Sequence, residues 1–359
     1  MKMVKLFPWI ILFLSIVGLL AVYSTDPLRG ENLGMLTFFI RQFIWFLLGW
    51  GIFFVVSRID YHWFIKLEWI LFLMIVLSLA AVLFFGKGDD IGARRWLFTR
   101  SVQPSEFSKI GFAVFLAAFL SAQPEEHGSW RFLIKTSLLS IIPTGLIFLE
   151  PDLGTALIII VLWFSGLYFC GFQWKKMLTI VAGLASLIPV FWVVLHDYQK
   201  KRLLSFFAPQ TDPLGTGYNV LQSQITIGAG GFFGKGWLSG TQSQLRFLPA
   251  HYTDFIFASW CEQLGFIGGI LILILFFCLI WTILRIGIEA LDLEGKMLCA
   301  LFGSMLIFQV LINIGMNMGV MPVTGIPLPF ISYGGSSFFI HMVAMGMVWN
   351  IAKSGGKEE

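Results

Sequence analysis

Three side chains at the edges of apolar segments could together carry out a group transfer. Asp254 stands just before an apolar run that begins near Ile256. An aspartate there could act as a general base, bind a metal ion or cap a helix. Arg95 and Arg202 would supply the fixed positive charge and paired N–H donors that a diphosphate leaving group requires. A base beside cations that can bind phosphate oxygens indicates group transfer from a lipid diphosphate.

A second pair of charges, Glu106 and Lys109, lies at the start of another apolar run. Pro104, Ser105 and Glu106 predict a helix start. The spacing of three residues puts Glu106 and Lys109 on one face of that helix. A local ion pair at the membrane interface is one interpretation. Ionisable groups inside a membrane helix are costly, however, so a functional pair is the other.

Two polar turns offer further candidates. Residues 150–155 are expected to form a tight turn. Its acids Glu150 and Asp152 could touch a site, but a turn in which Asp152 caps a helix explains them and is the favoured interpretation. Residues 313–337 are rich in Pro, Gly and Ser, which predicts a re-entrant or extended segment, and Ser332 is a candidate substrate contact within it. Such backbone is tolerated at membrane depth only inside protein or along a cavity. Gly334–Ser336 would then open a helix whose N-terminus suits an anion. An ordinary hairpin is the alternative.

The composition is typical of proteins with many membrane-spanning helices. Of the 359 residues, 57% are hydrophobic and 12% are charged, with 38 Phe and 14 Trp. This lies outside the usage of soluble domains and suits lipid-facing and interfacial positions. The four cysteines lie in or beside apolar runs without CxxC spacing, so packing roles are expected rather than a metal site or disulfides. The net charge of +4 does not indicate nucleic acid as a partner.

Apolar runs long enough to cross a bilayer recur along the chain and predict about ten transmembrane helices. We therefore predict an all-α integral membrane protein with a single membrane domain over residues 1–359. A long extracytoplasmic loop at 196–255 would separate its seventh and eighth helices, because this stretch is dense in glycine and turn residues and shows no core of its own. The runs cover residues 6–23, 39–57, 67–85, 107–122, 132–149, 153–171, 177–195, 256–284, 297–320 and 335–352.

The distribution of basic residues favours a cytoplasmic location for both termini. In that orientation Arg94, Arg95 and Arg202 fall on the outer side, where topology does not explain them, so they are better candidates for ligand contacts. The sequence shows no internal repeat, which argues against a transporter built from inverted repeats.

Several long motifs carry a resemblance to a known family, and together they extend over nearly the whole chain. The sequence resembles the SEDS proteins (shape, elongation, division and sporulation), and within them the RodA branch rather than the FtsW branch. The motifs are GARRWL, QPSEFSK, EPDLGTA, the stretch from Tyr198 to Gly269, and NMGVMPVTGIPLPFISYGGSS.

The resemblance implies a ten-helix peptidoglycan glycosyltransferase of the bacterial inner membrane, with its active site on the outer face. It would polymerise lipid II and work with a class B penicillin-binding protein. By position, Asp254 matches the essential aspartate of the family, while Glu106 and Lys109 match the polar pair of its cavity. The residues that match polar positions near the diphosphate site are Arg95, Gln199 and Arg202.

The sequence departs from the family pattern at four positions. Ala250 stands where Glu is common, Tyr252 where His is common, Gln263 where a second Glu is common, and Ala229 where Ser is usual. The changes at Ala250 and Gln263 weaken any claim that neighbouring acids complete a metal site. Asp254 is retained, so activity is still expected.

Transfer from an α-linked donor to a β-1,4 bond implies one inverting displacement, for which a single carboxylate base suffices. Asp254 would be that base, or would position the acceptor or a metal ion. Glu106 would hold Lys109 in place, and a divalent cation, Mg²⁺ or Mn²⁺, could bridge the phosphates with few protein ligands. The cations that would stabilise the diphosphate are Arg95, Lys109 and Arg202.

Other functional classes stay open at this point. A chain with many spans and a polar cavity could instead transport lipid II across the membrane. An outer cluster of base and cations without an inner counterpart favours the enzyme. A pure scaffold leaves the costly ionisable residues unexplained, and a ligase using another polyprenyl diphosphate sugar is a related alternative.

Overall fold

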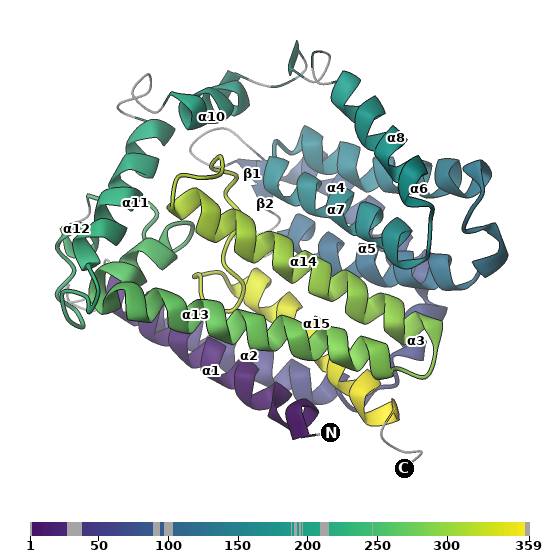
Figure 1. Cartoon of the computed structure of the whole chain (residues 1–359), viewed down its shortest axis with the longest axis horizontal. Helices are drawn as coiled ribbons and strands as arrows, with labels where there is room; N and C mark the ends of the chain where they lie inside the picture. Colours follow the sequence, from purple (N-terminus) through teal and green to yellow (C-terminus); the bar gives the residue numbers. More distant parts are fainter. Residues whose placement is uncertain are drawn as a thin grey trace. The chain divides into compact units, whose positions relative to one another are not determined.

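The computed structural model describes residues 2–26, 38–88, 94–96, 103–187, 189, 192–193, 195, 197–208, 215–245 and 247–355. The regular secondary structure of these residues is helical apart from one two-stranded hairpin (Figure 1). The helices are α1 (Lys2–Thr25), α2 (Phe38–Val56), α3 (His62–Lys66), α4 (Glu68–Phe85), α5 (Pro104–Ser121), the 3-10 turn η1 (Pro124–Glu126), α6 (Trp130–Leu149), α7 (Leu153–Phe169), α8 (Trp174–Ser186), α10 (Asp197–Phe207), α11 (Thr216–Gly230), α12 (Thr241–Gln244), α13 (Ile256–Glu289), α14 (Leu293–Asn317) and α15 (Gly335–Gly355). The strands are β1 (Lys87–Gly88) and β2 (Arg94–Trp96).

The predicted all-α membrane fold is confirmed. Within the described ranges, seven helices are long and apolar enough to cross a membrane: α1, α2, α4, α6, α13, α14 and α15. The other three predicted spans coincide with α5, α7 and α8. Of these, α5 carries Glu106 and Lys109 in its first two turns, and α7 is apolar but shorter. Helix α8 ends at Ser186, although the predicted run reached residue 195.

The chain divides into two compact units, each built from separate stretches of sequence. The first unit comprises Met1–Ile52, Lys201–Thr282 and Leu306–Met342, and the second comprises Phe53–Lys200, Ile283–Met305 and Val343–Glu359. In the second unit, α4, α5, α6 and α7 pack side by side, and β2 contacts α4 and α5 (Figure 1). Nearly all of α5 is buried, so this helix forms the centre of the second unit.

Asp152 joins the start of α5 to the start of α7. One of its carboxylate oxygens accepts a hydrogen bond from the Thr155 amide at 3.1 Å, as expected of a helix cap. The other accepts from Ser105 Oγ at 3.1 Å and from Gln103 Nε2 at 3.2 Å. The turn therefore has the predicted capping role, and it also fixes the end of α5 that carries the charged pair.

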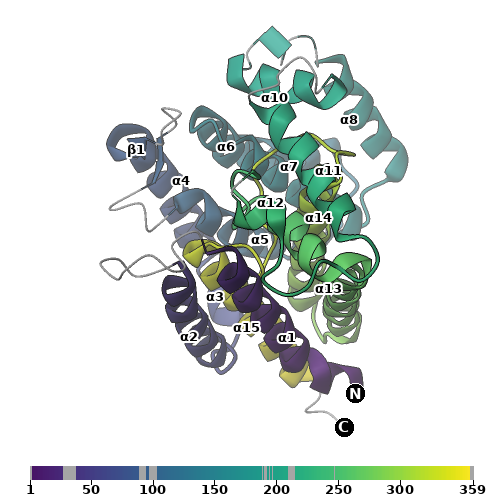
Figure 2. The ribbon, with the colours of Figure 1, turned by 90° about the vertical axis from the view of Figure 1, so that its left-hand side faces the viewer.

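The stretch 196–255, predicted as a long loop, contains helices in its described part that the sequence analysis did not predict. It contains α10, α11 and α12, and α11 lies beside the start of α13 (Figure 2). The buried face of α11 is made of small and polar residues rather than large apolar ones, which is why the sequence did not reveal a helix with a core. Those residues are Gly217, Val220, Ser223, Thr226 and Gly230.

Gly230 allows α11 to approach α13 closely. A Cβ atom at this position would lie 2.0 Å from the Cys261 carbonyl oxygen, which is backbone and cannot rotate away. We predict that Gly230→Ala lowers the free energy of unfolding by about 1–3 kcal/mol through overpacking. Gly228→Ala is the matched control, because a Cβ there meets nothing within 4 Å. Equal thermal unfolding midpoints for the two variants would contradict the close packing.

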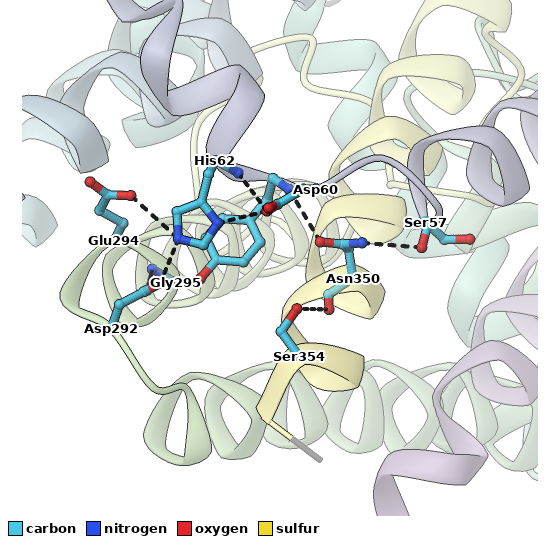
Figure 3. A network of polar contacts seen from close by, with 9 residues as sticks. Ser57, Asp60, His62, Asp292, Glu294, Gly295, Asn350 and Ser354 are labelled. Carbon is cyan, nitrogen blue, oxygen red and sulfur yellow. Dashed lines mark hydrogen bonds and ion pairs between the residues drawn. The ribbon is translucent and has the colours of Figure 1, made fainter. Parts of the chain in front are cut away.

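A polar cluster in the second unit joins three parts of the chain (Figure 3). His62 contacts Asp60 through Nδ1 at 2.6 Å and Asp292 through Nε2 at 2.9 Å. The Tyr61 hydroxyl also donates to Asp292, and the Tyr61 amide donates to the Asn350 side chain at 3.1 Å. The cluster thereby ties the turn after α2 to the α13–α14 turn and to α15.

The stability of this cluster should depend on pH. Burial lowers the pKa of His62, but hydrogen bonds and charges of Asp60 and Asp292 outweigh burial and raise the pKa above 6.5. The resulting stabilisation is fully present below pH 6.5 and is lost as the pH rises through the raised pKa. We expect the unfolding midpoint to fall more in the wild type than in His62→Gln as the pH rises above 6.5 and through the raised pKa. Identical pH dependence of both proteins would refute this role.

Candidate active site

Asp254 lies in the turn that leads into α13, and its backbone is held from two sides. Its side chain is partly exposed, whereas the adjoining Phe255 is buried. The carbonyl oxygen of Asp254 accepts hydrogen bonds from the Nδ2 atoms of Asn313 at 3.1 Å and Asn317 at 3.0 Å. The preceding carbonyl, of Thr253, accepts from Ser332 Oγ at 2.7 Å. Both asparagines fall in the segment 313–337, for which the sequence predicted no contact with Asp254.

The irregular segment between α14 and α15 covers residues 318–334 and runs beside this turn. The sequence predicted an extended segment over 313–337 but not its position beside Asp254. Ser332 also accepts a hydrogen bond from the Leu328 amide at 2.8 Å, so its hydroxyl links two parts of the first unit. The predicted contact of Ser332 with substrate stays a prediction. Tyr333 donates its amide to the Tyr252 carbonyl at 3.0 Å. Glycine at position 335 begins α15, as predicted.

Asp254 and Arg202 approach the same face of Gly325. A Cβ atom built on Gly325 would lie 3.7 Å from Asp254 Oδ2 and 3.7 Å from Arg202 Nη1. Gly325 has φ +75°, a conformation that strains other L-residues. A side chain at position 325 would therefore contact both the carboxylate and the guanidinium. The structure therefore brings the predicted base and one predicted diphosphate-binding cation together.

Three aromatic rings adjoin the Asp254 turn. The Phe38 ring centroid lies 4.8 Å from that of Tyr252 and 4.9 Å from that of Tyr333. Burial raises the pKa of Tyr252, and Tyr333 and the charge of Asp254 add to this effect. The Tyr252 hydroxyl is therefore neutral at physiological pH and can donate a hydrogen bond.

The predicted pair Glu106 and Lys109 forms in the second unit, deep within the helices. Lys109 Nζ lies 2.7 Å from Glu106 Oε1, and the two side chains are 1% and 6% exposed. Glu106 Oε2 is buried and has no hydrogen-bond partner among the described residues. The pair is therefore not a solvated interfacial contact. It offers one unused acceptor beside an ammonium group.

The remaining predicted site residues, Gln199 and Arg95, belong to α10 and β2. Gln199 is fully buried on α10, three residues before Arg202. Arg95 belongs to β2, but its side chain lies outside the described residues. His251 is buried, and its ring nitrogens contact the carbonyl oxygens of Leu248 at 2.8 Å and Thr25 at 3.1 Å. It therefore joins the end of α1 to the Asp254 turn.

The acidic residues that the structure describes near Asp254 do not assemble a metal site. Among the residues that the structure describes, no group of three or more His, Cys, Asp or Glu side chains could hold a metal ion. Glu262 is fully buried in α13, and its carboxylate accepts from the backbone amides of Gln242 and Ser243 and from Lys235. This carboxylate fastens α12 to α13 and is committed to that contact.

The sequence matches the FtsW/RodA/SpoVE family, described as cell cycle proteins, over residues 5–356. It is 36% identical over 348 residues to the peptidoglycan glycosyltransferase MrdB of Escherichia coli K12, covering 95% of this chain and 91% of that protein. It is 36% identical over 357 residues to the stage V sporulation protein E of Bacillus subtilis, covering 96% and 95% of the two chains.

Two solved structures have the same fold. A chain from a peptidoglycan synthase complex, whose structure concerns the coordination of polymerisation and crosslinking, superposes with a TM-score of 0.82 at 30% identity, covering 97% of this chain and 98% of that one. The rod shape-determining protein RodA of Thermus thermophilus superposes with a TM-score of 0.71 at 26% identity, covering 98% and 97%.

Proposed function

Because the chain belongs to the FtsW/RodA/SpoVE family, we propose that it is a peptidoglycan glycosyltransferase that polymerises lipid II during cell elongation. The observation that carries the site assignment is the approach of Asp254 and Arg202 to one face of Gly325. A partly exposed carboxylate beside a guanidinium provides a base for the incoming hydroxyl and a cation for the departing diphosphate.

The proposed reaction is a single inverting displacement. Asp254 accepts the proton of the acceptor 4-hydroxyl while that oxygen forms a bond to the anomeric carbon of the donor sugar. The bond from this carbon to the diphosphate oxygen breaks at the same time, and its electron pair leaves with undecaprenyl diphosphate. An α-linked donor thereby gives a β-1,4 bond. No acid is required because the diphosphate leaves as a stabilised anion.

Arg202 is the first cation of the proposed diphosphate site, since its guanidinium can bind two phosphate oxygens at once. The family resemblance also assigns three residues of the second unit to substrate binding: Arg95, Lys109 and Gln199. Within the second unit, Lys109 and the unused oxygen of Glu106 would engage a polar group that enters between the helices. Charged side chains buried among membrane helices usually have a functional role.

We also propose a divalent cation, Mg²⁺ or Mn²⁺, as an accessory to the diphosphate. The described residues offer Asp254 as a single partly exposed carboxylate there, which suits an ion that takes most of its ligands from phosphate and water. When bound, the ion would neutralise charge on the leaving diphosphate. The proton transfer assigned to Asp254 does not depend on it.

The proposal includes a class B penicillin-binding protein as partner. Support comes from the fold shared with a chain of a peptidoglycan synthase complex that coordinates polymerisation and crosslinking. The chain is a multi-pass membrane protein, and we propose that both termini are cytoplasmic and that Asp254 faces the outer side of the bacterial inner membrane. The distribution of basic residues supports this orientation.

Reconstituted vesicles distinguish this enzyme from a lipid II transporter. The purified protein is incorporated together with lipid II, and glycan products and lipid II movement between leaflets are measured in parallel. We expect glycan strands without faster movement of lipid II than in protein-free vesicles. Accelerated movement with no glycan would reject the polymerase and favour transport.

A further inference from the structure

Two asparagines stand one helical turn apart at the end of α14, a helix that is otherwise largely apolar. Asn313 and Asn317 are both 0% exposed. A buried amide is costly unless its donors and acceptor are hydrogen-bonded, and membrane helices contain few of them without a purpose. Their contacts account for the burial of both side chains.

The Nδ2 donors converge on the backbone of the active-site segments. Both amides donate to the Asp254 carbonyl oxygen, at 3.1 Å from Asn313 and 3.0 Å from Asn317. Asn313 also donates to the Ile326 carbonyl at 2.8 Å. Ile326 follows Gly325, which faces the Asp254 carboxylate and Arg202. A single side chain therefore connects the two backbone segments that border the proposed reaction centre.

Asn317 adds a connection to α11. Its Oδ1 accepts from the Ala258 amide at 3.1 Å, which satisfies a donor in the first turn of α13. The Asn317 carbonyl accepts from Ser223 Oγ of α11 at 2.8 Å. Asn317 therefore contacts the start of α13, the middle of α11 and the Asp254 carbonyl.

We propose that Asn313 and Asn317 are positioning residues for the proposed base, and that Asn317 couples the seating of α11 to the position of Asp254. The inference rests on the proposed function, since it assigns these residues a role through Asp254. Two amide donors on the Asp254 carbonyl restrain the orientation of that peptide, and with it the position from which the carboxylate reaches toward Gly325. Displacing a catalytic group by about 1 Å can reduce the rate about 100-fold.

The test measures kcat and KM for lipid II polymerisation together with thermal unfolding, in the full-length protein. Asn313→Ala and Asn317→Ala each remove one donor to Asp254, and the double variant removes both. We expect kcat to fall about 10-fold in each single variant and about 100-fold in the double variant. KM should stay within about twofold, because neither side chain is assigned to substrate.

Gln309 supplies the matched control on the same helix. It is also 0% exposed and one turn before Asn313, but its Oε1 contacts His341 at 2.9 Å and not the Asp254 segment. Gln309→Leu should change the unfolding midpoint without a specific loss of kcat. A loss of kcat in the asparagine variants no larger than in Gln309→Leu would overturn the proposal.

Three further variants make the outcome decisive. Ser223→Ala removes the α11 contact and leaves both donors to Asp254 in place, so it should lower kcat by a few-fold if Asn317 couples α11 to the base. If the alanine variants do not fold, Asn313→Ser carries the test, and wild-type kcat in that variant overturns the positioning role. Asp254→Ala is assayed in parallel: activity in that variant would instead reject the proposed base.

Discussion

Asp254→Asn is expected to reduce lipid II polymerisation by about 10²–10⁴-fold, the usual contribution of a general base. Asparagine has nearly the same shape as aspartate but cannot accept the proton of the acceptor hydroxyl. The backbone contacts from Asn313 and Asn317 to residue 254 are retained, because they involve its carbonyl oxygen. The loss should therefore be in kcat rather than in folding.

Thermal unfolding in detergent provides the control for Asp254→Asn. The side chain is partly exposed, so its replacement should leave the unfolding midpoint close to that of the wild type. Near-normal glycan synthesis by the folded variant would contradict the assignment of Asp254 as the base. A variant that is inactive because it is unfolded would be recognised by its lowered midpoint.

Lys109→Met is expected to lower the free energy of unfolding by about 3–5 kcal/mol, because it leaves the Glu106 carboxylate buried without its cation. Lys109 is 1% exposed, and its Nζ lies 2.7 Å from Glu106 Oε1. Few single substitutions in the described part of the chain should destabilise it more. Thermal or chemical unfolding of the purified variant measures the effect.

The double variant Glu106→Gln with Lys109→Met separates stability from function. Removing both charges should recover much of the lost stability. The attraction within a buried ion pair does little more than offset the free-energy cost of removing both charges from water. If Lys109 engages substrate as proposed, polymerisation should stay low in this stable protein. Full activity in the double variant would show that the pair serves only the packing of α5.

The positions of the membrane helices could be predicted because long apolar runs determine them. The start of α5 and the Asp152 cap were also predictable, since proline at the first helical turn and aspartate before a helix have local physical causes. The assignment to the SEDS family is confirmed by the match over residues 5–356. The helix positions, the start of α5 and the Asp152 cap each depend on a short stretch of sequence.

The features that were missed depend on contacts between distant residues. The buried face of α11 has no large apolar stripe, because it meets α13 through Gly230 and small side chains. A periodicity argument therefore cannot find it. The role of Asn313 and Asn317 likewise depends on the Asp254 carbonyl, which lies about sixty residues away in the chain. Two asparagines at i and i+4 in an apolar helix were the available signal.

Glycan formation from purified lipid II is the most direct test of the proposed activity. Wild type and Asp254→Ala are compared with and without the penicillin-binding partner and divalent ions, and the products are treated with a muramidase that cleaves β-1,4 bonds. The account predicts long, muramidase-sensitive strands from the wild type and none from Asp254→Ala. Lipid II left unpolymerised by the wild type under every condition, or equal strands from both proteins, would contradict it.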